Sequence, residues 1–289
     1  MNRLSPISIV FLCFIGIAFQ PLLAFSEISK PTPIWKTVED FSNCCHEALE
    51  KASAEKSALL KLKPDLSLAD AFDVFDRVNN LMIFLDDCSG WSHLINEVHP
   101  DECIREVAEK WSQNIELFAT QTFLDPQVYT AIASATKHID INDTPLYRFA
   151  SKLLLDFQMS GIEKDQVTRN RIQAIQEELV KLSQDYSRNL REDRRYIKVA
   201  QADLQGLPLD WIASHPADAS GTVTISTDTP DFMPCQEYAD SAELRKRLCQ
   251  THLQRAYPKN EEVLIKTLHL RHELAKILGH PHYASYKAQ

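Results

Sequence analysis

The chain has 289 residues, which suffices for one large domain or two ordinary ones, and a formal net charge of −9, which disfavours nucleic acid as a partner. It contains only six glycines, and no two lie close together. A phosphate-binding glycine loop and a G-x-S-x-G nucleophile elbow are therefore excluded. The shortage of glycine, with abundant Leu, Ala, Glu and Lys, favours a mostly helical fold.

The first 26 residues are predicted to be a secretory signal peptide. A short positive region (MNR) precedes an apolar run (ISIVFLCFIGIAF), and small residues offer cleavage points after Ala24 or Ser26. The alternative is an uncleaved membrane anchor, because Met1–Phe25 could barely span a bilayer. We expect an exported mature chain, periplasmic or secreted, with no stable membrane span once the signal is removed.

Cysteine usage matters for an exported chain. Removal of the signal peptide leaves an even number of cysteines, which an oxidising compartment can pair in fifteen ways. We favour a bridge between Cys88 and Cys103, which flank a short turn region, although buried free thiols are an equal alternative. The six residues are Cys44, Cys45, Cys88, Cys103, Cys235 and Cys249.

Helical patterns follow one another from residue 34 onward. Ser67 suits the N-cap of the second helix, and Asp125-Pro126 suits the cap and first turn of the fourth. In the sixth helix, Ile172, Ile175, Leu179, Leu182 and Tyr186 recur in steps of three and four and predict a buried seam. The predicted helices span 34–62, 68–88, from about 100, from 126, 144–161, 164–194, 241–256 and 260–278. One short strand or hairpin is expected near 221–227.

The stretch LHLRHELAKILGHPHY, residues 268–283, contains part of a zinc-protease motif. His-Glu-x-x-His places two imidazoles one helical turn apart, but Lys276 stands four residues after His272. We predict that His269, His272, Glu273 and Lys276 lie on the polar face of the last long helix. His280 and His282 fall in the turn that follows.

Two pairs of adjacent acids, Asp86-Asp87 and Glu177-Glu178, direct their carboxylates apart on a helix. The residues alone therefore assign no catalytic, cofactor-binding or metal-binding position in this chain.

Two segments resemble the thimet oligopeptidase and oligopeptidase A family of zinc peptidases. The first runs from Asp156 to Pro208 and the second from Asn260 to Tyr286. The matching positions are Asp156, Phe157, Gly161, Ile172, Ile175, Leu179, Leu182, Asn189, Leu190, Leu204, Gly206, Leu207, Pro208, Asn260, Leu264, Leu270, Arg271, Leu278, Gly279, Tyr283, Ala284 and Tyr286. With 71–161 fitting the order of the family's early helices, the resemblance covers nearly all of residues 27–289.

The resemblance implies an all-α fold that forms one wall of a channel admitting short peptides. In the family, zinc is held by His-Glu-x-x-His and a downstream glutamate in the C-terminal half, which residues 27–289 do not include. The chain is therefore predicted to be the N-terminal, channel-wall part of an exported zinc metallo-oligopeptidase. Zinc is expected in the full-length parent and not in this chain, which we expect to be inactive alone. Endopeptidase and dipeptidyl carboxypeptidase types both remain open.

Two other interpretations of the chain are open. The chain is alternatively a stand-alone, non-enzymatic helical module that binds peptides or a partner, or it is complemented by a separately encoded catalytic half. The broad apolar face of the last long helix, which includes Leu264, Leu268 and Leu274, favours a missing partner region.

Overall fold

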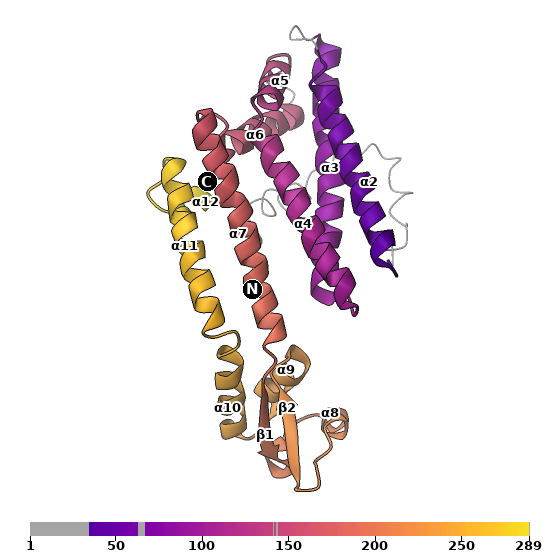
Figure 1. Cartoon of the computed structure of the whole chain (residues 1–289), viewed down its shortest axis with the longest axis vertical. Coiled ribbons are helices and arrows are strands. Elements are labelled where there is room, and N and C mark those ends of the chain that lie inside the picture. Colours follow the sequence, from indigo (N-terminus) through magenta and orange to yellow (C-terminus); the bar gives the residue numbers. More distant parts are fainter. Residues whose placement is uncertain (1–34, 63–66, 141, 143, 289) are drawn as a thin grey trace. The chain divides into compact units, whose positions relative to one another are not determined.

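The computed structural model describes residues 35–62, 67–140, 142 and 144–288, which form helices and one two-stranded sheet (Figure 1). The predicted signal peptide lies outside the described residues. Within them, no helix combines the length and apolar character needed to cross a membrane. The chain divides into two compact units. Unit 1 extends to Lys181 and resumes at His269, and unit 2 is Leu182–Leu268.

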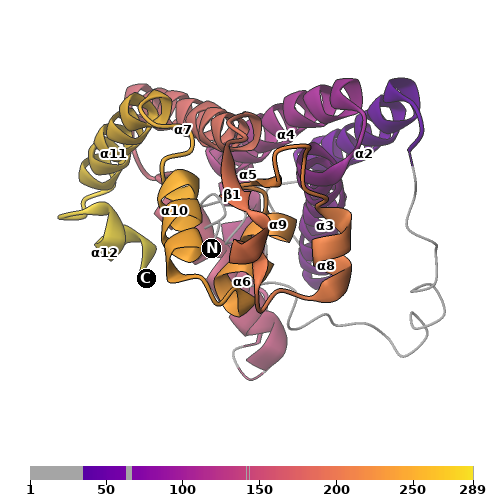
Figure 2. The same cartoon turned by 90° about the horizontal axis from the view of Figure 1, so that it is seen from below.

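Unit 1 contains three long antiparallel helices: α2 (Val38–Leu59), α3 (Leu68–Val98) and α4 (Glu102–Phe123). Figures 1 and 2 both place them side by side. The prediction of long antiparallel helices is confirmed. Helix α3 is longer than the predicted 68–88, because Trp91 and Ile95 continue its apolar stripe against α2 and α4.

Side-chain caps explain where these helices begin. Ser67 forms a capping box with Asp70, as its hydroxyl accepts a hydrogen bond from the Asp70 amide. Asp125 caps α5 (Pro126–Thr136) by accepting from the Gln127 amide at 3.0 Å. The predicted starts at Ser67 and Asp125-Pro126 are therefore confirmed. Helix α6 (Thr144–Ser160) follows α5.

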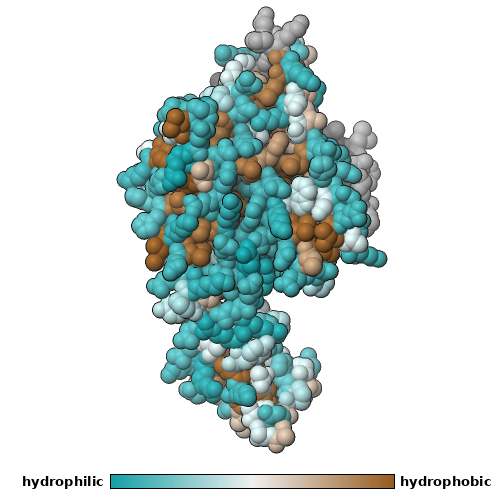
Figure 3. Space-filling model, viewed as in Figure 1, coloured by the Kyte–Doolittle hydropathy of each residue, from teal (hydrophilic) through white to brown (hydrophobic). Residues whose placement is uncertain are grey.

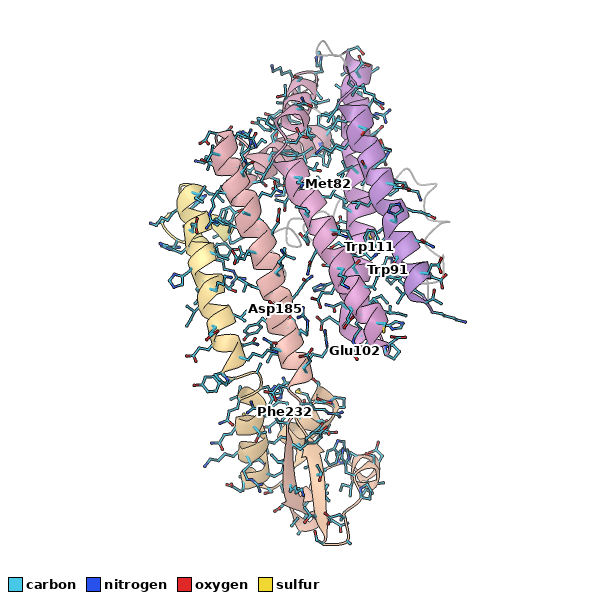
Figure 4. All side chains as sticks on the ribbon, in the orientation of Figure 1. Met82, Trp91, Glu102, Trp111, Asp185 and Phe232 are labelled. Atoms are coloured by element: carbon cyan, nitrogen blue, oxygen red, sulfur yellow. The ribbon has the colours of Figure 1, made fainter. Side chains whose placement is uncertain are left out.

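The core of unit 1 has two apolar clusters. One gathers side chains of α3, α5 and α6 around Phe157, and the other gathers side chains of α2, α3 and α4 around Phe41. Met82 contacts both clusters, and Trp91 and Trp111 pack against the second. Figure 4 labels these three side chains. Phe41 and Phe157 are each fully buried.

Helices α7 (Gln166–Glu192) and α11 (Lys259–Ile277) each contribute residues to both units, and α12 (Tyr283–Lys287) belongs to unit 1. The predicted seam of α7 is buried from Ile172 to Leu182, whereas Tyr186 is 38% exposed. The buried seam residues are Ile172, Ile175, Leu179 and Leu182.

Unit 2 is built around an antiparallel strand pair. Strand β1 (Tyr196–Ala200) pairs with β2 (Thr222–Ser226) in the register Val199↔Val223 and Ile197↔Ile225. These four side chains face one side and pack on α9 (Thr229–Tyr238) and α10 (Ala242–Leu253). The predicted strand is confirmed as β2. Its partner β1, the short helix α8 (Leu209–Ser214) and helix α9 were not predicted.

Phe232 of α9 stacks on the ring of His252 of α10, with 4.0 Å between ring centroids (Figure 4). This contact ties the two helices that cover the sheet.

The cysteines from Cys44 to Cys249 are free thiols in the structure. The bridge favoured between Cys88 and Cys103 is not formed, because Cys88 is buried against Cys45 of α2, whereas Cys103 is exposed at the start of α4.

Candidate functional site

The incomplete zinc motif lies on α11, where its glutamate has a structural partner. Both oxygens of Glu273 accept hydrogen bonds from the Arg171 guanidinium of α7, at 2.6 and 2.7 Å. This contact lowers the pKa of the Glu273 carboxyl. His272 and Lys276 are exposed on the same helix, as predicted. The glutamate that would activate a metal-bound water thus forms a bidentate ion pair instead.

The other two histidines of the stretch serve the chain turn after α11. His282 caps α12, with its Nδ1 accepting a hydrogen bond from the Ser285 amide at 3.1 Å. The His280 ring lies 5.4 Å from the Tyr286 ring. Within the part of the chain that the structure describes, no three His, Cys, Asp or Glu side chains come together to hold a metal ion. These residues do not fit a zinc site.

Completing the motif is expected to leave the chain without peptidase activity. Lys276→His restores the His-Glu-x-x-His spacing, but Glu273 remains bound to Arg171, and among the described residues no cluster of three metal-ligating side chains includes His272. We expect a zinc Kd on the order of micromolar or weaker. Competition with a zinc-binding dye measures the zinc Kd, and a quenched-peptide assay measures peptidase activity. Lys276→Gln is the matched control. Zinc-dependent cleavage by the Lys276→His variant would contradict this assignment.

A cationic cluster lies at the junction of α11 and α12, and it comprises Arg271, Tyr283, Tyr286 and Lys287. The Arg271 guanidinium lies 5.2 Å from the centre of the Tyr283 ring, and Lys287 Nζ lies 4.6 Å from that of Tyr286. Burial, and then the charge of Arg271, lowers the pKa of Lys287 to about 8. Two cations held together on aromatic rings make this cluster a candidate binding site for a carboxylate.

The free energy of unfolding is expected to increase with pH above about 8 because of Lys287. Between its pKa of about 8 in the folded chain and the ordinary 10.5, the unfolded chain binds the additional proton, so rising pH favours the folded state. Lys287→Gln removes a half-buried charge and should raise the free energy of unfolding by about 1–2 kcal/mol at neutral pH. Urea titrations at about pH 7 and about pH 9 test this, since the variant's gain must shrink at the higher pH. The exposed Lys246→Gln is the control.

The pKa values of the adjacent acids Asp86 and Asp87 on α3 are shifted. Burial, and then the charge of Asp87, raises the pKa of Asp86 to about 7, and burial also raises that of Asp87. A carboxyl that titrates near neutrality is a candidate general acid or base. In the described ranges, no cluster of three metal-ligating side chains forms around Asp86.

Several of the positions that carry the family resemblance hold helices together. In unit 1, a Cβ on Gly161 would lie 2.6 Å from Ile172 Cδ1 and 2.9 Å from Leu278 Cδ2, so glycine permits this close approach. In unit 2, the buried Asn189 amide donates to Asn260 Oδ1 at 2.8 Å, and Asn260 donates to the Tyr186 carbonyl. These contacts are architectural. Sequence reasoning found the residues but not their pairing.

Comparison with known proteins places the chain beside oligopeptidases. It is 26% identical to a thimet-like oligopeptidase of Dictyostelium discoideum over 88% of its own length, and 26% identical to saccharolysin of Saccharomyces cerevisiae over 91%. Oligopeptidase A of Escherichia coli is 26% identical over 90% of the chain. The chain spans only 38–39% of the length of these relatives. No family model matches it.

Proposed function

The chain is related to the thimet oligopeptidase and oligopeptidase A family, and on that premise we propose that it forms a substrate-binding wall of an exported zinc oligopeptidase that hydrolyses short peptides. The observation that carries this proposal is the similarity to oligopeptidases along about nine-tenths of the chain. Zinc and the general base would come from the part of the enzyme that this chain does not span.

An exposed apolar surface on α11 supports the proposal that another part of the enzyme packs against this chain. On α11, Leu264, Ile265 and Leu268 are 46%, 50% and 56% exposed, whereas Leu274 is fully buried. Hydrophobic side chains interrupt the polar surface over this helix in Figure 3. The predicted apolar face thus divides into a buried end and an exposed end. In the proposed enzyme, the catalytic part packs on the exposed end.

The test begins with the DNA beyond the codon for Gln289. If the frame continues into a His-Glu-x-x-His region, the whole protein is expressed; otherwise, the chain is mixed with a separately produced catalytic region of an oligopeptidase. We expect zinc-dependent cleavage of a quenched short peptide only with the catalytic part present, and loss of cleavage with a chelator. Cleavage by residues 27–289 alone would overturn the proposal.

A stand-alone peptide-binding module is the second candidate, and the cationic cluster favours it. Among the described residues, neither Arg271 nor Lys287 forms an ion pair with an acidic side chain, so both remain able to bind a peptide carboxylate. This function predicts a monodisperse chain that melts cooperatively and binds a peptide more weakly once its C-terminus is amidated. Equal affinity for the free and amidated peptides would exclude it.

A further inference from the structure

The thiols of Cys45 and Cys88 meet in the core between α2 and α3. Their side chains are 1% and 5% exposed and belong to the same apolar cluster. Cys88 Sγ also lies 3.9 Å from the carbonyl oxygen of Cys45, and Ser92 Oγ lies 3.8 Å from Cys45 Sγ. We propose that Cys45 and Cys88 form a disulfide that joins α2 to α3 when the chain folds under oxidising conditions.

The positions of the six cysteines in the structure favour Cys45–Cys88 over the other pairings that the sequence permits. Cys44 and Cys103 are exposed, so neither thiol is held in the core near a partner. Cys235 is buried in a different cluster, in unit 2. Cys45 and Cys88 share one buried cluster, and Cys88 Sγ lies 3.9 Å from the backbone carbonyl oxygen of Cys45, so this pair is the one placed to form a disulfide. The bond would close a loop of roughly 40 residues, which restricts the unfolded chain.

The chemistry is thiol–disulfide exchange with a disulfide oxidant such as oxidised glutathione. The thiolate of Cys45 attacks the oxidant, forms a mixed disulfide and releases one thiol. Cys88 then loses its proton and attacks the mixed disulfide at Cys45, releasing the second thiol. Two thiols are oxidised and one external disulfide is reduced. Because both sulfurs are buried, the exchange takes place before α2 and α3 have finished docking.

Mapping the bond requires care, because tryptic peptide 37–51 carries both Cys44 and Cys45, and tryptic peptide 78–105 carries both Cys88 and Cys103. The experiment therefore uses the Cys44→Ser/Cys103→Ser double variant, whose substitutions fall on exposed positions. The protein is refolded with reduced and oxidised glutathione, alkylated under denaturing conditions and digested. We expect peptides 37–51 and 78–105 to be joined, and to separate after reduction. Recovery of both cysteines as alkylated thiols would overturn the proposal.

Thermal unfolding gives a second measurement that does not depend on the double variant. Oxidation should raise the Tm of the unsubstituted chain by about 5–10 °C relative to the reduced chain. The rise should disappear in Cys88→Ser and persist in Cys103→Ser. A rise that survives Cys88→Ser, or a bond that tandem mass spectrometry of the unsubstituted chain assigns to Cys44 or Cys103, would also overturn the proposal. Because the refolding is done in vitro, the result does not depend on export or peptidase function.

Discussion

Gly206→Ala is expected to lower the free energy of unfolding of unit 2 by about 3–5 kcal/mol. Gly206 has a φ of +90°, and an added Cβ would collide with the Tyr238 carbonyl oxygen and lie 2.9 Å from Asp240 Oδ1. The Asp240 amide donates to the Gln205 carbonyl at 2.8 Å, which holds the two backbone segments together. The collision is with backbone, so a side-chain rotation cannot relieve it.

Gly221→Ala is the matched control for this prediction. Gly221 also has a positive φ, of +77°, but an added Cβ there meets nothing within 4 Å. Only the backbone strain remains, and we expect a loss of about 1 kcal/mol. A urea titration of protein labelled with 5-fluorotryptophan reports the unfolding of each unit separately. Trp211 lies in unit 2, whereas unit 1 contains Trp35, Trp91 and Trp111. Equal losses in the two variants would show that the close approach to Tyr238 has no energetic role.

Local chemistry is what made the helical part of the fold predictable. Ser67 and Asp125-Pro126 carry their own start signals, and the α7 seam follows from its spacing. Strand β1 was missed because YIKVA is short and follows charged residues, so only its pairing with β2 identifies it. Helix α9 was missed because it contains Pro234, which ordinarily interrupts a helix.

The candidate site depends on partners that are distant in sequence. Arg171 and Glu273 are 102 residues apart, so nothing in either segment reveals that the motif glutamate is already bound. Similarly, α11 has one apolar stripe in sequence, but the fold buries Leu274 and exposes Leu264. In both cases the chemistry of the side chain is known from the sequence, whereas the three-dimensional surroundings that determine its role are not.

Phe157→Ala is expected to lower the free energy of unfolding of unit 1 by about 3–5 kcal/mol. Phe157, on α6, is fully buried, and its ring lies 4.7 Å from that of Phe123 on α4 and 6.1 Å from that of Tyr129 on α5. Truncation leaves a cavity where three helices meet, and rigid packing prevents the surrounding side chains from filling it. Leu155→Ala, on the same helix but 44% exposed, should cost less than about 1 kcal/mol. In the fluorotryptophan titration, Phe157→Ala should shift the transitions of Trp35, Trp91 and Trp111 more than that of Trp211. A loss no larger than that of Leu155→Ala would mean that the aromatic cluster does not determine the stability of unit 1.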